Sequence, residues 1–235
     1  LRFITTQEEK LKRLEMSGID NVIVVNFTKE FSRVSSEDFI SEYILKHINP
    51  VKLVIGYDHH FGNNRMGDFN LLSEMQNKYN FQVQRIVAHD VENIAVSSTK
   101  IRHSLQQGDI ERANALLGYK FSYIGNVVSG KKIGREIGYR TANIEVEREF
   151  RLIETSGVYA TYVDYEGKEY KSMTYIGKKP TVNNDEIENI EVHIFDFDGD
   201  LYDKAIKVRF VKRVRGEQKF ESLDALKKQI QIDEK

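Results

Sequence analysis

The hydrophobic periodicity of the sequence changes near residue 119, and this change constrains the fold more than any other feature. Up to Gly118, short β-branched runs alternate with segments whose apolar residues recur at helical spacing. From Phe121 onward, five or six segments with strand-like alternation follow one another. We therefore predict two domains: residues 1–118 form an α/β domain, and residues 119–235 form a small antiparallel β-barrel with a C-terminal helix.

The first domain is predicted to contain a parallel sheet with crossover helices. Thr5 and Thr6, three residues before Glu8 and Glu9, form a capping-box signal for a helix that Gly18 ends. Ser35 and Ser36 precede a second helix, and a third is expected near 68–79. Buried strands are predicted at NVIVV (21–25) and VKLVIG (51–56), with a further strand at 81–88.

Two short helical segments, TKIRHSLQQ and DIERANALLG, end the first domain, with Gly108 and Gly118 as their stop signals. In the second domain, YEGKEY predicts a hairpin turn around Glu166 and Gly167, and the C-terminal helix is expected to start at Ser222.

Charge and composition exclude several classes of protein. Thirty-five basic and thirty-six acidic residues give a formal net charge of −1, so no nucleic acid or anionic membrane partner is expected. The lack of cysteine excludes disulfide frameworks and thiolate sites and favours a reducing, cytoplasmic location. No apolar run is long enough to span a bilayer. The sequence does not indicate an oligomeric state.

The stretch GKKIGREIGYRTAN (130–143) is the strongest candidate for a phosphate site. It fits neither the dinucleotide fingerprint nor the P-loop, but its glycines allow backbone amides to approach an anion, with basic side chains nearby. On a strand, Thr141 and Asn143 would point to one face and offer two neutral oxygens of the kind Mg²⁺ accepts. From these residues alone, a simple bend between two strands remains the alternative.

Several ordered motifs resemble a known family. GNVVSGKKIGREIGYRTANI is similar to the glycine-rich loop and P-T-A-N motif of riboflavin kinases, and KKPTV and EVHIFDFDGDLYDKAIKVRF continue the likeness. VIGYDHHFGNNRMGD and VSSTKIR resemble motifs of the nucleotidyltransferase module of bacterial bifunctional riboflavin kinase/FAD synthetases. The resemblance implies ATP, riboflavin, FMN and FAD as substrates or products, with Mg²⁺: the barrel would phosphorylate riboflavin, and the α/β domain would adenylylate FMN.

The resemblance also implies roles for individual residues of the barrel. Thr141 and Asn143 would hold Mg-ATP, and Glu191 would be the catalytic base. The phosphates would be wrapped by the glycine loop, at Gly130, Lys131, Gly134 and Gly138.

In the first domain, the resemblance implies that Ser97, Ser98, Thr99 and Arg102 meet ATP phosphates at a helix N-terminus. Residues matching the family's second motif would lie near the nucleotide or flavin: Asp58, Phe61, Gly62, Arg65 and Gly67. We do not expect His59 and His60 to bind a metal, because adjacent residues of an extended chain face opposite ways.

The sequence departs from the family pattern in two places. Arg140 replaces the proline of P-T-A-N, which alters the loop or adds a cation, and we expect lower kinase activity than in an Arg140→Pro variant. The resemblance starts inside the family pattern, at LRFITTQEEK, without the H-x-G-H motif of the nucleotidyltransferase. A truncated chain is favoured over a decayed module, because a sheet without its central strand would leave apolar faces uncovered. We expect this polypeptide to be a poor adenylyltransferase.

Two alternatives to an active kinase remain open at the level of sequence. One is a catalytically decayed flavin-binding or regulatory module, which would bind flavin without forming FMN. The other is a nucleic-acid-binding barrel, for which VRFVKRVRG is the best segment, although the nearly neutral total charge argues against it.

Overall fold

The chain folds into two compact units in the computed structural model, which describes residues 2–87, 90–91, 94–130, 138–180 and 186–234. One unit comprises Leu1–Ser17 together with Val96–Lys235, and the other comprises Gly18–Ala95. The first unit thus includes the start of the chain and two helices that precede residue 119. The functional boundary at 118/119 stays a prediction.

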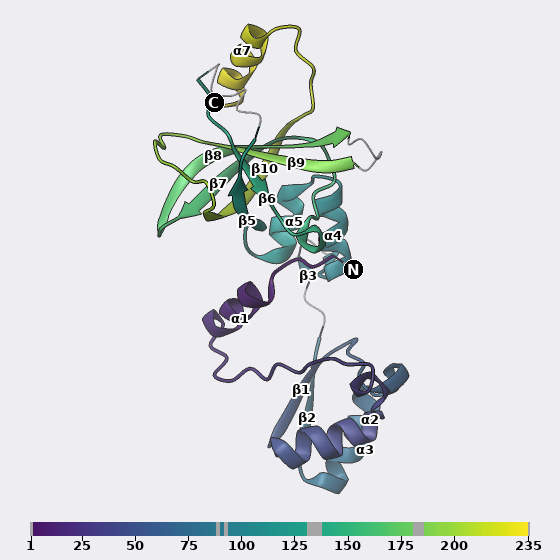
Figure 1. The fold of residues 1–235 in the computed structure, drawn as a ribbon. Helices are drawn as coiled ribbons and strands as arrows, with labels where there is room; N and C mark the ends of the chain where they lie inside the picture. The colour runs from purple at the N-terminus through teal and green to yellow at the C-terminus, as the bar shows by residue number, and fades with distance from the viewer. Residues whose placement is uncertain (1, 88–89, 92–93, 131–137, 181–185, 235) are drawn as a thin grey trace. The chain divides into compact units, whose positions relative to one another are not determined.

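The larger unit is built around a closed barrel of six antiparallel strands (Figure 1). The barrel order is β10-β5-β6-β9-β8-β7. The strands are β5 (Ser122–Val128), β6 (Ala142–Glu145), β7 (Gly157–Tyr165), β8 (Lys168–Pro180), β9 (Glu186–Ile194) and β10 (Ala205–Gly216). The predicted antiparallel barrel is therefore confirmed, and each of its strands pairs with two neighbours.

Aromatic side chains fill the barrel interior. Phe121, Tyr123, Tyr159 and Phe210 are all buried, and Phe210 packs against each of the other three rings. The hydroxyl of Tyr123 accepts hydrogen bonds from two successive backbone amides after η4 (Arg148–Phe150), so this phenol is satisfied in the interior. The β7–β8 hairpin turns at Glu166 and Gly167, both with positive φ, as the sequence predicted.

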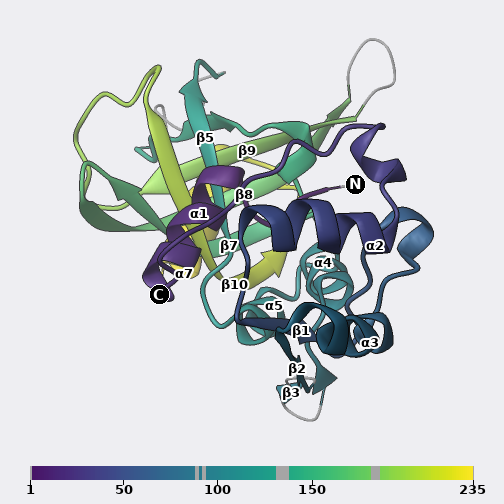
Figure 2. The same cartoon turned by 90° about the horizontal axis from the view of Figure 1, so that it is seen from below.

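The described residues of the same unit form four α-helices. They are α1 (Gln7–Met16), α4 (Ser98–Gln106), α5 (Ile110–Leu117) and α7 (Leu223–Asp233). The predicted capping box of α1 is present, with Thr6 accepting from Glu9 N and the Glu9 carboxylate returning to Thr6 N. Both views show α4 and α5 side by side (Figures 1 and 2). The Asn114 side chain joins α5 to the barrel, because it donates to the Phe210 carbonyl and accepts from the Phe121 amide.

The smaller unit contains a two-stranded parallel sheet, β1 (Lys52–Gly56) with β2 (Gln82–Ile86). Helix α3 (Phe69–Tyr79) lies beside it in Figure 1. Further segments are η1 (Phe31–Arg33), α2 (Ser36–Asp38), the π-helical η2 (Phe39–Leu45), η3 (Asn63–Arg65), β3 (Asp90–Val91) and β4 (Ile94–Ala95). The core of this unit consists of Ile40, Leu72, Met75 and Phe81 with partly buried neighbours.

Two predictions for the smaller unit are wrong. NVIVV (21–25) is not a strand: no described strand pairs with it, and Ile23 and Val24 are 66% and 62% exposed. VKLVIG does form a strand, but its side chains alternate between exposed and half-buried rather than being buried throughout. Both differences have one cause. A parallel strand is buried by neighbouring strands and by helices on both faces, and the described ladder stops at two strands.

Three further helical segments begin after a serine whose side chain caps them. Ser35 caps the helical segment that starts at Ser36, Ser97 caps α4, and Ser222 caps α7. Gly118 follows α5 in the left-handed conformation, and Gly108 follows α4 with a φ of 72°. No helix among the described residues has the length and apolar character needed to cross a membrane.

Candidate active site on the outer face of the barrel

A single row of cross-strand neighbours runs across five barrel strands. Asn143 on β6 pairs with Glu191 on β9, Glu191 pairs with Tyr175 on β8, and the row continues through Val158 on β7 to Arg215 on β10. Directly paired residues of an antiparallel ladder share one face. The alternate residues, such as Val192 and Thr174, are fully buried inside the barrel. The row therefore lies on the outer face.

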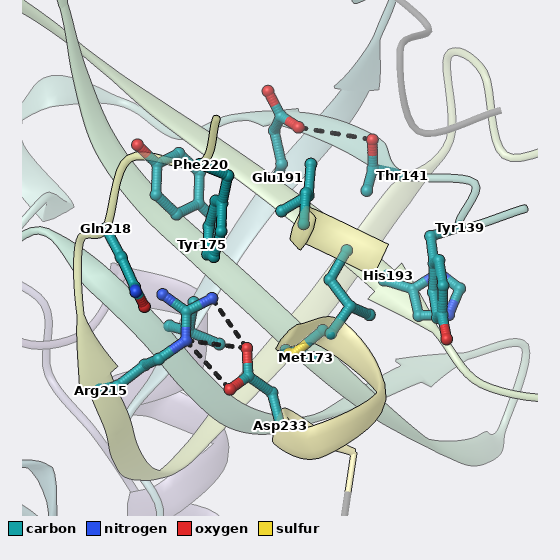
Figure 3. A pocket seen from close by; sticks show the side chains of 13 residues that line it. Tyr139, Thr141, Met173, Tyr175, Glu191, His193, Arg215, Gln218, Phe220 and Asp233 are labelled. Atoms are coloured by element: carbon teal, nitrogen blue, oxygen red, sulfur yellow. Dashed lines mark hydrogen bonds and ion pairs between the residues drawn. The ribbon is translucent and has the colours of Figure 1, made fainter. Parts of the chain in front are cut away.

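Glu191 is the central carboxylate of this row. Its Oε1 accepts a hydrogen bond of 2.5 Å from the Asn189 side chain amide, two residues earlier on the same strand. Its Oε2 lies 3.5 Å from the Thr141 hydroxyl, and the two side chains face each other in Figure 3. Strand pairing thus brings together the three residues that were predicted to act in one site: Thr141, Asn143 and Glu191.

A cavity of about 350 Å³ lies against this row, between the barrel and α7 (Figure 3). One wall is the outer face of the barrel, with Glu191, Tyr175 and Met173. The opposite wall consists of Phe220 and the α7 residues Leu226 and Ile230. Seven of its thirteen lining residues are apolar or aromatic and six are polar or charged, a combination that can hold the apolar body of an organic ligand and orient its polar groups. We call it the closed cavity.

Two polar contacts hold the residues that follow β10 over the closed cavity. Arg215 bonds the Asp233 carboxylate near the end of α7, at 2.9 and 3.0 Å from Nε and 2.8 Å from Nη2. The Asp233 side chain is only 2% exposed. The Tyr175 hydroxyl donates to Glu217 at 2.5 Å. Burial, followed by this bond to a carboxylate, raises the pKa of Tyr175 well above its ordinary value, so the phenol stays protonated at neutral pH.

A second, larger hollow of about 1300 Å³ opens on the other side of Thr141. It is lined by Gly138, Arg140 and the 195–202 segment, among others, and we call it the open hollow. Tyr139, Thr141 and His193 border both spaces, whereas Glu191 lines the closed cavity alone. Thr141 therefore stands at the boundary between the two spaces, with the carboxylate on one side of it.

The backbone at Gly130 lies close to the side chain of Asn143. A Cβ on Gly130 would lie 1.9 Å from the Asn143 side chain nitrogen, so any side chain would displace the amide. Gly138 has a φ of 85°, a conformation that favours glycine. The two ends of the predicted phosphate loop thus meet the conditions for close backbone approach. Lys131 and Gly134 lie outside the described residues.

The residues predicted for nucleotide binding in the first domain fall into both compact units. Asp58, Phe61, Gly62 and Arg65 belong to the smaller unit. Gly62 has a φ of 73°, and a Cβ there would overlap Ser36, whose hydroxyl donates to the Phe61 carbonyl. Phe61 and Gly67 exchange backbone hydrogen bonds. This motif is therefore a tight, glycine-dependent turn.

Ser98, Thr99 and Arg102 belong to the larger unit, on α4. Ser98 and Thr99 occupy the first turn, and the N-cap Ser97 accepts from the Lys100 amide. Arg102 Nε donates to the Arg2 carbonyl at 2.9 Å, so this side chain also holds the start of the chain.

The sequence analysis missed most of the closed cavity. Because Glu191 lies in a segment with strand-like alternation, its neighbour two residues on, His193, was predictable as a residue of the same face. Met173 and Tyr175 on β8 follow the same alternation. The contribution of α7 had no local signal, because Asp233 meets its partner Arg215 only after the barrel has closed.

Comparison with known proteins agrees with this architecture. A riboflavin kinase family model matches residues 117–235, and an FAD synthetase family model matches residues 1–100. A bifunctional riboflavin kinase/FMN adenylyltransferase from Buchnera aphidicola subsp. Acyrthosiphon pisum is 39% identical, over 98% of this chain and 74% of that protein. The protein of the same name from Escherichia coli K12 is 37% identical, over 98% of this chain and 73% of its own length.

One solved structure covers nearly the whole chain. It is described as a macrolide-efflux protein from Streptococcus pneumoniae, and it is 30% identical with a TM-score of 0.89, over 98% of this chain and 74% of that chain. The two family models match the two halves of the sequence, and the relatives with the bifunctional name match nearly all of it. The chain belongs to the family of bifunctional riboflavin kinase/FMN adenylyltransferases.

Proposed function

We propose that the barrel domain, residues 119–235, transfers the γ-phosphoryl group of ATP to the terminal hydroxyl of the ribityl chain of riboflavin, giving FMN and ADP. The riboflavin kinase family model and the names of the relatives support this reaction. One observation carries the assignment of the site: Thr141 borders both the closed cavity and the open hollow, and Glu191 lines only the former. A phosphoryl donor and an acceptor can therefore meet at Thr141.

We assign the acceptor to the closed cavity. A flavin ring is flat and largely apolar, which suits a space of about 350 Å³ between Met173, Tyr175 and Phe220. The ribityl hydroxyl would then reach Glu191, because this carboxylate lines the same cavity beside Thr141. The donor nucleotide is assigned to the open hollow, beyond Thr141.

Glu191 acts as the general base in this proposal. The acceptor hydroxyl loses its proton to the Glu191 carboxylate while its oxygen forms a bond to the γ-phosphorus, and the bond to the bridging oxygen of ADP breaks. The amide of Asn189 orients the carboxylate through Oε1, which leaves Oε2 toward Thr141.

The residues beside Glu191 fit a magnesium ion. Thr141 offers a hydroxyl oxygen, Asn143 an amide oxygen and Glu191 a carboxylate, a hard-oxygen set of the kind Mg²⁺ accepts beside phosphate oxygens. We propose that Thr141 and Asn143 hold Mg-ATP, and that the glycines at 130 and 138 let the backbone approach the phosphates. Bound Mg²⁺ would neutralise part of the negative charge of the transferring group.

For residues 1–118 we propose the second reaction of the family, transfer of AMP from ATP to FMN. The FAD synthetase model over residues 1–100 supports it. Ser98, Thr99 and Arg102 would contact phosphates at the N-terminus of α4, and Asp58, Phe61, Gly62 and Arg65 would contact nucleotide or flavin. A cytoplasmic location and the exclusion of nucleic acid and membrane partners stay predictions based on composition.

The test is to incubate the purified chain with riboflavin, ATP and Mg²⁺ and to separate the flavins by chromatography. We expect FMN, and a drop of about 10²- to 10⁴-fold in its rate of formation for Glu191→Gln. Glu145→Gln, an exposed acid on β6, is the matched control and should not change the rate. Wild-type rates in Glu191→Gln would contradict the assignment. Flavin binding without any FMN from the wild type would instead favour a module that only binds flavin.

A further inference from the structure

Arg140 places a cation on the open hollow, directly before Thr141. Its Nη1 lies 3.0 Å from Asp198 Oδ1, in the 195–202 segment that also lines the hollow. The two side chains are 67% and 93% exposed, so water reaches both groups. Ion pairs with this exposure contribute little to stability, because solvent screens the attraction and both side chains lose freedom. The pair can therefore be exchanged at low cost.

The backbone carbonyl of Arg140 has a partner of its own on β9. The His193 ring lies with Nδ1 2.8 Å from the Arg140 carbonyl, and since a carbonyl can only accept, Nδ1 is the donor. Tyr139 packs edge-on against the same ring at 5.1 Å. His193 is two residues from Glu191 on β9. The position of residue 140 is thus tied to the strand of the proposed base, while the partner of its guanidinium among the described residues is an exposed carboxylate.

Because acidic residues outnumber basic ones around the open hollow, the positive charge of Arg140 matters for the binding of a phosphate there. Of the described residues that line it, Asp196, Asp198, Asp200 and Glu234 are acidic, and Arg140, Lys171 and Lys227 are basic. This lining does not by itself attract a polyphosphate. Arg140 is adjacent in sequence to Thr141, where donor and acceptor are proposed to meet. A guanidinium can also bind phosphate oxygens with two parallel hydrogen bonds, which a single exposed carboxylate contact does not match.

We propose that Arg140 is a phosphate-binding residue for the donor nucleotide, and that Asp198 is its counter-ion in the absence of nucleotide. When the nucleotide binds, the guanidinium leaves Asp198 and bonds the phosphate oxygens. This inference rests on the proposed function, because it takes the open hollow as the site of ATP. It assigns the residue that replaces the family's proline a role of its own in donor binding.

The test is a double-mutant cycle on ATP binding. We expect Arg140→Gln to raise the KM for ATP about tenfold, which corresponds to the loss of one charge-assisted contact. Asp198→Asn should lower this KM about two- to threefold, because it removes the group that competes for the guanidinium. The double variant should equal Arg140→Gln alone, and the KM for riboflavin should not change. Arg148→Gln, an exposed arginine in η4, is the control for loss of charge and should leave ATP binding unchanged.

The opposite signs of the two single variants separate this proposal from a structural one. If the pair served only to hold the 195–202 segment against the barrel, both variants would weaken ATP binding alike, and the proposal would be wrong. An unchanged KM for ATP in Arg140→Gln would overturn it as well. Arg140→Pro should share the rise in KM, even though fixing φ is expected to increase turnover.

Calorimetry with Mg-ATP and without riboflavin tests the phosphate contact of Arg140 separately from the proposed kinase function. A wild type that binds ATP but makes no FMN would contradict the proposed function. The affinity shifts of the Arg140 and Asp198 variants would still be measurable, and a loss in Arg140→Gln together with a gain in Asp198→Asn would support the phosphate contact.

Discussion

The barrel and the smaller unit differ in how the backbone hydrogen bonds of their strands are paired. Every barrel strand pairs with two neighbouring strands, and large aromatic side chains pack in the interior of the barrel. In the described part of the smaller unit, two parallel strands pack with a core of four buried hydrophobic side chains, while Val54 and Ile86 on these strands are about half exposed. A closed ladder needs no further cover, whereas a parallel sheet depends on strands and helices at its sides. Local stability should therefore differ between the two regions.

A matched pair of core truncations tests this difference most strongly. Leu152 in the barrel unit and Leu72 in the smaller unit are 0% and 1% exposed. Leucine to alanine in a core costs about 2 to 5 kcal/mol, and the cost falls where the surroundings can collapse into the space. We expect Leu152→Ala near the upper limit and Leu72→Ala near the lower one. Hydrogen exchange followed peptide by peptide measures each region separately, and equal losses would remove the contrast.

Ion pairs in the two regions give a second comparison. Asp233 is buried against Arg215, whereas Glu42 on η2 forms an exposed pair with Lys46, the residue that follows η2. Asp233→Asn leaves the arginine without its counter-charge and should destabilise the docking of α7 by about 3 kcal/mol. Glu42→Gln should have no measurable effect. Because α7 forms a wall of the closed cavity, Asp233→Asn should also raise the KM for riboflavin. An unchanged KM would show that the cavity does not depend on this contact.

Alkaline pH offers the smallest and most specific test. Burial raises the pKa of Tyr159 from 10.0 to about 12, against an opposing effect of Arg213. The unfolded chain then releases this proton at a lower pH than the folded barrel does, so stability falls as the pH rises from 10 to 12. The loss should reach at most about 2 to 3 kcal/mol. Urea unfolding of the barrel at pH 9 and pH 11.5 measures it, and Tyr159→Phe should reduce the difference between the two values.

The same contrast explains what the sequence predicted well. Barrel strands are recognisable from local alternation, and the Glu166–Gly167 turn and the Thr6–Glu9 capping box each depend on a few adjacent residues. Exposed NVIVV has the composition of a buried strand, but whether it becomes one depends on neighbours that local patterns do not contain.

For the candidate site as well, residues close together in the sequence were predicted, whereas contacts between distant residues were not. Thr141 and Asn143 are close in sequence, and their relation to Glu191 followed from the family motif before strand pairing placed them together. The α7 wall of the closed cavity and the contact of His193 with the Arg140 carbonyl arise from contacts between residues far apart in the chain. No periodicity or spacing encodes such contacts.

The row from Asn143 to Arg215 has a consequence for how the protein can change. Because strand side chains alternate, substitutions at Met173 or Tyr175 alter the cavity surface, while the residues between and beside them keep the interior intact. Along one strand, every second residue therefore affects ligand preference, and the residues between them affect thermal stability. The cost of this arrangement is strict register: a slip of β9 by one residue would turn Glu191 into the barrel and Val192 out of it, and would remove the site and the core together.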